Sequence, residues 1–293
     1  MRYVLENDTL RVEIDSFGAE LKSVKRKSDD KEYMWYADKK YWGRTSPVLF
    51  PFVGNCRNKE YRYGGKTYAI GQHGFARDME HTMESRTDDT IWFSLHSNEE
   101  TMEKYPFAFV LKIGYNLTGN ELKVMWKVEN PDTKTLYFSI GAHPAFLCPF
   151  NGEENKLGYG LQFAGLKEVH HHGNTPDTGL AVMSEDIVIP LEDEKVYFTP
   201  GFFDRCTYMV EGKQTGEVSL VTPDGKPYVT MDFDAPLFAI WSPEGKDAPF
   251  VCIEPWYGRC DADDFEGTLE ERAYENAVEP EQAFEASYTI RYL

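Results

Sequence analysis

The chain has 293 residues, of which 41% are hydrophobic and 15% aromatic, and it carries a formal net charge of −18. This length and apolar content suffice for one large core, so we predict a single domain over residues 1–293. The acidic balance disfavours nucleic acid and anionic membrane surfaces as partners, because proteins bind both through clustered basic residues.

The five cysteines are an odd number at wide spacings, which predicts reduced thiols rather than a disulfide framework or a paired zinc site. Acidic side chains already occur within Met1–Asp8, a pattern that differs from a secretory signal. No stretch is apolar over the length of a membrane span. We therefore expect a cytoplasmic protein, whose oligomeric state is left open.

Alternating apolar and polar residues dominate the chain and predict β-strands from its start to its end. The period is clearest on both sides of Thr118-Gly119-Asn120, where it predicts a hairpin. Further strands are predicted over residues 10–14, 91–95, 136–140, 218–221, 228–231, 250–253 and 288–292. The predicted fold class is therefore all-β, as one large antiparallel β-sandwich.

Helical signals are few. Ser97-Asn98-Glu99-Glu100 has the spacing of a capping box and predicts a short helix that ends before Pro106. A second helix is predicted over residues 267–277. No internal repeat, linker or change of composition marks a domain boundary.

The first candidate site is the histidine in Gln72-His73-Gly74-Phe75-Ala76-Arg77. Its small neighbours allow a sharp turn and the close approach of a ligand. In an extended segment His73 and Arg77 can project from one face, and the arginine fork suits vicinal hydroxyls or phosphate oxygens. The alternatives are a structural histidine and a surface ion pair.

The second candidate is the histidine in Gly141-Ala142-His143-Pro144-Ala145-Phe146, which follows an apolar run. Pro144 favours an extended backbone at His143. An imidazole at the end of a buried strand titrates near neutrality and can both give and take a proton. The alternative is a core histidine whose two ring nitrogens are hydrogen-bonded.

The third candidate is Glu254, which follows the apolar run of residues 250–253 at a position that faces inward. A buried carboxylate is costly unless it is paired or hydrogen-bonded. Burial would also raise its pKa toward the range that suits a general base. The structural alternative is a salt bridge to Arg259.

Other side chains carry weaker signals. Asp204 is a candidate for binding a sugar hydroxyl, and Asp232 and Asp234 compete for the same role. The tryptophans that can stack on a sugar face, or simply fill core, are Trp42, Trp241 and Trp256.

The run His170-His171-His172 has the composition of a metal tract. Adjacent residues of a strand face opposite sides, and no acidic partner has matching spacing. The run is therefore predicted to be a solvated loop, and no metal site is predicted.

The sequence segments around His73, His143 and Glu254 together resemble the aldose 1-epimerase (galactose mutarotase-like) superfamily, particularly its LacX-like and hexose-6-phosphate 1-epimerase-like branches. The resemblance extends along nearly the whole chain and is most specific in His73-Gly74-Phe75-Ala76-Arg77. Its other segments are Gly18–Leu21, Arg44–Gly54, Gly141–Phe146 and Glu254–Trp256. It implies a large antiparallel β-sandwich that interconverts the α and β anomers of an aldose without a cofactor.

The resemblance also implies roles for individual residues. His143 is expected to protonate the ring oxygen of the sugar, and Glu254 to remove the proton of the C1 hydroxyl. His73 is expected to hold the C1 hydroxyl or the ring oxygen, and Asp204 another hydroxyl.

Arg44 and Arg77 correspond to arginines that clamp the phosphate in the phosphate-recognising branch. The expected partner is therefore a small-molecule hexose or hexose 6-phosphate.

Two other functions fit the same composition. A carbohydrate-binding protein on this fold would keep the aromatic residues and arginines but would not need both a histidine and a glutamate. The other is a glycoside hydrolase or polysaccharide lyase on a related sandwich; hydrolases normally need two carboxylates across the scissile bond, and one stands out here. The predicted pairing of an acid and a base therefore favours the epimerase.

Overall fold

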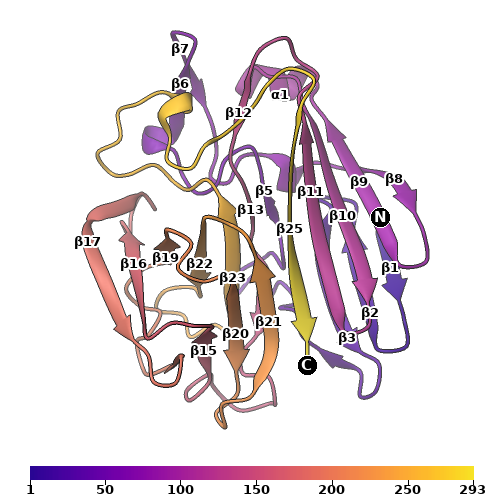
Figure 1. Ribbon diagram of the computed structural model, residues 1–293, viewed down its shortest axis with the longest axis vertical. Helices are drawn as coiled ribbons and strands as arrows, with labels where there is room; N and C mark the ends of the chain where they lie inside the picture. The colour runs from indigo at the N-terminus through magenta and orange to yellow at the C-terminus, as the bar shows by residue number, and fades with distance from the viewer.

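The structure is a computed structural model that describes residues 1–293, and strands make up nearly all of its regular elements. Two large antiparallel sheets lie against each other, and the shorter N-terminal sheet lies beside them (Figure 1). The predicted all-β sandwich is thus confirmed.

The first large sheet has nine strands and contains the predicted hairpin. Their order is β18 (Lys195–Tyr197), β15 (Gly160–Phe163), β20 (Glu217–Val221), β21 (Pro227–Phe233), β25 (Ala283–Tyr292), β11 (Glu121–Glu129), β10 (Val110–Thr118), β9 (Thr90–His96) and β8 (Thr82–Arg86). The β10–β11 hairpin turns at Gly119, whose φ of 58° lies in the left-handed region that glycine adopts easily.

The second large sheet has eight strands and positions the candidate site. Their order is β17 (Ala181–Pro190), β16 (Glu168–Asn174), β19 (Tyr208–Glu211), β22 (Leu237–Trp241), β23 (Phe250–Tyr257), β13 (Ile140–Ala142) and β5 (Val48–Leu49), with β14 (Ala145–Leu147) also paired to β23. Strand β23 therefore has neighbours on both sides and lies in the middle of this sheet (Figure 1).

The remaining elements are short. The N-terminal sheet consists of β1 (Arg2–Glu6), β2 (Leu10–Asp15), β3 (Glu20–Arg26) and β4 (Lys31–Glu32); two further pairs are β6 (Glu60–Tyr63) with β7 (Lys66–Ala69) and β12 (Leu136–Phe138) with β24 (Asn276–Val278). The helical segments are α1 (Glu99–Lys104) and the 3-10 turns η1 (Arg57–Lys59), η2 (Ala76–Asp78) and η3 (Leu269–Glu271).

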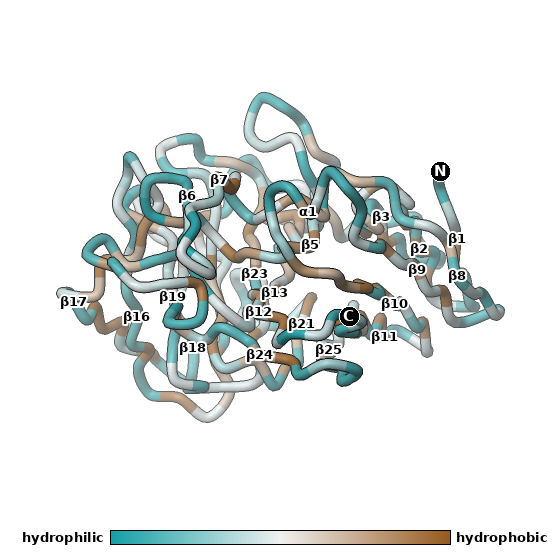
Figure 2. Tube along the Cα trace, turned by 90° about the horizontal axis from the view of Figure 1, so that it is seen from above, coloured by the Kyte–Doolittle hydropathy of each residue, from teal (hydrophilic) through white to brown (hydrophobic).

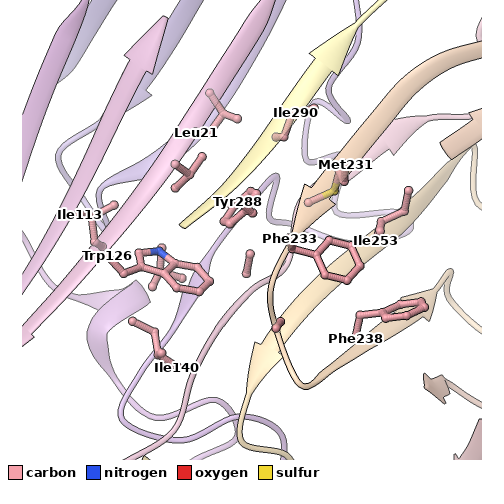
Figure 3. Packing of buried hydrophobic residues seen from close by; sticks show 14 of the residues in the cluster. Leu21, Ile113, Trp126, Ile140, Met231, Phe233, Phe238, Ile253, Tyr288 and Ile290 are labelled. Atoms are coloured by element: carbon pink, nitrogen blue, oxygen red, sulfur yellow. The ribbon is translucent and has the colours of Figure 1, made fainter. Parts of the chain in front are cut away.

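The core lies between the two large sheets. Figure 3 shows Met231 and Ile290 from the nine-stranded sheet beside Phe238 and Ile253 from the eight-stranded one, and all four are buried. Fully burying such a side chain contributes about 1.5–3 kcal/mol. Seen from above, hydrophobic segments gather toward the middle of the molecule and hydrophilic ones follow the outer loops (Figure 2).

The helix predictions were half right. Helix α1 ends before Pro106 as predicted, but its cap is Asn98, which exchanges hydrogen bonds with Thr101. The helix predicted over residues 267–277 is wrong. Only η3 forms there, because Tyr274 has a φ of 58° and the buried side chain of Arg272 is tied to neighbouring segments.

Two other predictions need correction. The histidine run is not a loop but part of strand β16, and its middle member, His171, is buried against Tyr208. The single strand predicted over residues 136–140 is divided between β12 and β13, because Ser139 leaves both ladders and donates its backbone N–H to Pro51 O. No helix in the structure combines the length and apolar character needed to cross a bilayer.

Candidate active site

A cavity of about 440 Å³ opens over strands β19, β22 and β23, and both central candidates, His143 and Glu254, line it. Glu254 lies within β23, opposite Ala239 of β22. His143 follows directly after β13, whose Gly141 pairs with Trp256 of β23. Neighbouring strands therefore bring together two residues that lie 111 positions apart in the chain (254 − 143).

The imidazole of His143 contacts the carboxylate of Glu254. His143 Nε2 lies 3.3 Å from Glu254 Oε2, and the two residues are 7% and 1% exposed. Neither carboxylate oxygen has a hydrogen-bond partner of good geometry, and neither has His143 Nδ1. The pair is thus almost closed off from solvent and open only toward the cavity.

Burial controls the protonation of this pair. It raises the pKa of Glu254 well above its ordinary value, because the carboxylate loses its hydration. Burial, followed by the charge of Arg77, lowers the pKa of His143 to about 3. Burial therefore disfavours the charged form of both groups.

Two tryptophans fix the ring of His143. Trp42 stacks on it with ring centroids 4.6 Å apart, and Trp241 meets it edge-on at 5.2 Å. Trp256 closes another wall and donates its indole N–H to Ala142 O at 3.3 Å. These three residues were predicted to stack on a sugar or to fill core, and all three line the cavity.

His73 lies in a tight turn that determines its tautomer. Its backbone N–H donates to Gly54 O at 2.8 Å, and its Nδ1 accepts from Gly54 N at 3.0 Å. The proton of the neutral ring therefore sits on Nε2. Burial and the nearby charge of Arg77 hold the pKa of His73 well below its ordinary value. His73 lines the cavity, with its ring centroid 5.7 Å from that of His143.

The two arginines have different positions. Arg77 lines the cavity from η2, donates through Nη2 to Gln72 O at 2.8 Å, and has its buried Nε 3.8 Å from Asp78 Oδ2. Arg44 does not line the cavity, and it pairs with Asp78 at 2.7 Å. The structure thus brings Arg77 to the site and leaves Arg44 just outside it, while both charges lower the pKa of His143.

Asp204 does not line this cavity. It lines a separate cavity of about 310 Å³, which it shares with Lys156, and its Oδ1 accepts from Gly245 N at 3.1 Å. Asp232 and Asp234, its competitors in the sequence, do not line the His143 cavity either. The alternative partner proposed for Glu254 is also absent, because Arg259 pairs with Glu211 at 2.7 Å.

Several residues that line the cavity were not predicted from the sequence. Asn174 ends β16, Asp177 and Thr178 come from the connection between β16 and β17, and Glu244 follows β22. Thr-Pro-Asp-Thr-Gly over residues 175–179 has only the signature of a turn, so nothing in it indicates which side chains face a ligand.

One cysteine also lies beside the histidine–glutamate pair. Cys252 precedes Glu254 by two residues on β23, and side chains two apart point to the same face of a strand. One donor atom from each of His143, Cys252 and Glu254 lies within 4.8 Å of the other two. This is the one cluster in the structure whose histidine, cysteine and carboxylate groups converge in this way.

Comparison with known proteins finds one matching protein family and relatives that align along the whole chain. The family described as aldose 1-epimerase matches residues 1–261. The chromosomal protein LacX of Lactococcus lactis subsp. lactis is 30% identical over 300 residues, which cover 100% of both chains.

Two solved structures share both fold and sequence with it. A galactose mutarotase related enzyme from Lactobacillus acidophilus is 36% identical, with a TM-score of 0.94 over 100% of this chain and 97% of that one. A galactose mutarotase-like protein from Lactobacillus casei is 29% identical, with a TM-score of 0.91 over 100% of both.

Proposed function

The chain belongs to the aldose 1-epimerase family, and on that premise we propose that it interconverts the α and β anomers of a hexose. The observation that carries the proposal is the contact between His143 Nε2 and Glu254 Oε2 at 3.3 Å, buried at the base of a cavity. An acid and a base at one site are what the reaction needs.

The reaction proceeds by opening and closing the sugar ring. Glu254 takes the proton of the C1 hydroxyl, and the electrons of that O–H bond form the C1 carbonyl as the bond between C1 and the ring oxygen breaks. His143 gives its proton to the departing ring oxygen. Rotation about the C1–C2 bond then turns the other carbonyl face to the oxygen, and the same transfers in reverse close the ring. Each positioned acid or base contributes roughly 10²–10⁴-fold to the rate.

Substrate binding moves the proton of the pair to the residue that needs it. Before substrate binds, the proposed location of that proton is Glu254, because burial raises the pKa of Glu254 and lowers that of His143, and the carboxylate oxygens lack hydrogen-bond donors. Sugar hydroxyls supply those donors and lower the pKa of Glu254, because hydrogen bonds to a carboxylate favour its charged form. The proton then passes from Glu254 Oε2 to His143 Nε2, two atoms that lie 3.3 Å apart, and His143 becomes the acid.

Three other residues position the sugar. His73 donates its Nε2–H to a sugar oxygen, since its Nδ1 is occupied by Gly54 N–H. Arg77, which lines the cavity, donates to ring hydroxyls through its guanidinium group. Trp256 offers an apolar surface beside Glu254, which suits the C–H faces of a hexose.

The charges of the cavity favour a neutral sugar over a sugar phosphate. Apart from the buried Glu254, whose charged form is disfavoured, its acidic and basic side chains are Arg77, Asp177 and Glu244, which are one cation and two acids. The second arginine, Arg44, is paired with Asp78 outside the cavity. A phosphate dianion here would meet two exposed carboxylates and one arginine, so we infer that the substrate is an unphosphorylated hexose.

A carbohydrate-binding protein without turnover is the alternative function. Binding alone gives no reason to keep a carboxyl group buried without a hydrogen-bond partner, because such a group costs stability. Buried groups with strongly shifted pKa values cluster at functional sites. The unpartnered Glu254 therefore favours the enzyme.

Polarimetry of freshly dissolved sugars tests the proposal. We expect the protein to accelerate the mutarotation of α-glucose or α-galactose well above the spontaneous rate, and to accelerate glucose 6-phosphate less. Faster turnover of the phosphate would contradict the inferred neutral substrate. Tryptophan fluorescence that reports sugar binding, with no acceleration of any hexose, would support the binding-protein alternative.

A further inference from the structure

The base of the cavity combines three kinds of metal-ligand atom. His143 supplies an imidazole nitrogen, Cys252 a thiol and Glu254 a carboxylate, and one donor atom of each lies within 4.8 Å of the other two. Nitrogen, sulfur and oxygen donors of this mixture are typical of Zn²⁺ sites, whereas Mg²⁺ and Ca²⁺ require oxygen alone.

The spacing of two of these donors already matches zinc coordination. Zn²⁺ binds histidine nitrogen and carboxylate oxygen at about 2.0–2.1 Å, so two such ligands of one tetrahedral ion lie roughly 3.3–3.4 Å apart. His143 Nε2 and Glu254 Oε2 are separated by 3.3 Å. The sulfur of Cys252 is the third donor, within 4.8 Å of the other two, and it must move closer to reach the Zn–S distance of about 2.3 Å.

The same groups lack other partners. Both oxygens of Glu254 and Nδ1 of His143 are buried without a hydrogen bond, and Glu254 is only 1% exposed. A cation at this point would supply the carboxylate with the compensation that the protein does not. Since His143 and Glu254 line the cavity, an ion can reach them from solvent.

We propose that His143, Cys252 and Glu254 bind one Zn²⁺ ion at the base of the cavity, and that the bound ion blocks catalysis. The thiol of Cys252 and the carboxyl of Glu254 each release a proton as the ion binds, and the fourth coordination position faces the cavity. The binding does not depend on the proposed function. The inhibition does, because the ion occupies the acid and the base that ring opening uses.

The other concentration of histidines cannot form an equivalent site. His170 meets Asp186 through Nδ1 at 2.8 Å and Glu168 through Nε2 at 3.4 Å. The two carboxylates therefore lie at opposite nitrogens of the ring and cannot share one ion with it. Its ring is also 43% exposed, so solvent competes for any ligand there.

Co²⁺ provides a spectroscopic test that is independent of activity. Co²⁺ takes tetrahedral sites similar to those of Zn²⁺, and coordination by a thiolate produces an intense charge-transfer absorption in the near ultraviolet. We expect this band in the wild-type protein at one Co²⁺ per chain, and we expect Zn²⁺ to abolish it by displacement. A wild-type protein without the band would overturn the proposal.

Cysteine variants identify the ligand. Cys252→Ala should lose the band and bind Zn²⁺ more than about 100-fold less tightly, because even loss of an outer-shell partner costs 10–100-fold. The matched control is Cys260→Ser, since Cys260 lines the cavity, which Cys252 does not, but its thiol faces Met209 Sδ at 3.7 Å. It should retain the band. A band that persists in Cys252→Ala would contradict the assignment. Should this variant fail to fold, Cys252→Ser provides the same test.

The inhibition is measured separately. Zn²⁺ should suppress the acceleration of mutarotation by the wild-type protein, and a chelator should restore it. Each variant is compared with its own zinc-free rate, and Cys252→Ala should require more than tenfold higher Zn²⁺ for the same suppression. Equal sensitivity in both proteins would overturn the inhibitory role. A protein that shows the cobalt band but no mutarotase activity would contradict the proposed function, not the metal site.

Discussion

Glu254 and His143 show how burial sets the chemistry of single residues. The proposed reaction needs one proton on the pair, because a second proton removes the base and the loss of the first removes the acid. The second proton binds His143, whose pKa is lowered to about 3, and the first leaves Glu254, whose pKa is raised by burial. Activity should therefore stay level as pH falls from 7 to 5.

The measurement is the rate of anomer exchange as a function of pH, corrected for the spontaneous reaction at each pH. An acid limb near pH 6.5, the ordinary pKa of histidine, would contradict this assignment. Such a limb would mean that His143 is protonated in the free protein at neutral pH and acts from that state.

The tautomer of His73 is a second expectation at the residue scale. Because Nδ1 accepts from Gly54 N–H, the ring proton should sit on Nε2, and its low pKa should keep the ring neutral. Long-range ¹H–¹⁵N NMR correlations should show the Nε2–H tautomer without titration between pH 8 and 5. A ring protonated on Nδ1, or one that titrates near 6.5, would contradict the proposed donor role.

Site residues could be predicted where a reactive side chain interrupts a distinctive background. Glu254 interrupts a buried apolar strand, and His143 sits among small residues after one. Asp204 had no such background, and it lies at another cavity. Asp177 and Glu244 could not be found, because loop residues face a site through tertiary packing that leaves no period in the sequence.

At the scale of elements, the turn that carries His73 depends on close backbone packing. Gly74 has a φ of 66°, and a Cβ there would lie 2.3 Å from Phe50 O. Gly74→Ala should cost at least about 2 kcal/mol of stability and should reduce catalysis by moving His73. Urea unfolding and the rate of anomer exchange measure the two effects.

Gly71→Ala is the matched control in the same turn. A Cβ at Gly71 would meet nothing within 4 Å, and its φ lies outside the left-handed region. This variant should stay within about 0.5 kcal/mol of the wild type, as exposed substitutions usually do. Equal losses in both variants would mean that general rigidity of the turn, rather than the contact with Phe50 O, controls the site.

Most strands could be predicted because their faces differ in burial, which imposes alternation on the sequence. In β10 and β11, buried Leu111 and Val124 alternate with outward-facing polar residues. The histidine run in β16 was misread because polar side chains occupy both faces there, so that alternation disappears. The helix predicted over residues 267–277 failed because a buried ion pair between Arg272 and Asp261, 2.7 Å long, holds the segment against another part of the chain.

At the scale of the whole molecule, three buried histidines make the stability of this acidic protein sensitive to low pH. His73, His81 and His143 are all buried, and burial lowers the pKa of each. A histidine whose folded pKa is lowered contributes stability that is complete above pH 6.5 and is lost as pH falls toward the folded value. His81, at about 4, should account for about 2 kcal/mol of lost unfolding free energy between pH 7 and pH 5.

Urea unfolding of wild type and His81→Leu at both pH values tests this contribution. The variant removes the titration but keeps an apolar side chain of similar size, so it should lose less stability than wild type on acidification. Glu254 and Glu275 act in the opposite direction, since burial raises their pKa, but they are common to both proteins. Equal losses would contradict the assignment to His81.

The sequence did not reveal which strands pair with one another. Alternation identifies a strand but not its neighbours, and β23 is bordered by β22, β13 and β14, the last two from far earlier in the chain. That pairing creates the contact between His143 and Glu254. The sandwich class could therefore be predicted from local patterns, while the site needed the tertiary structure.

The most direct test of the central claim is the exchange rate between the α and β anomers of glucose and galactose, measured by NMR with wild type and Glu254→Gln. The wild-type protein should accelerate exchange, and the variant, if correctly folded by circular dichroism, should lose roughly 10²–10⁴-fold because the base is gone. Equal acceleration by both proteins would contradict the acid–base pair as the catalytic centre.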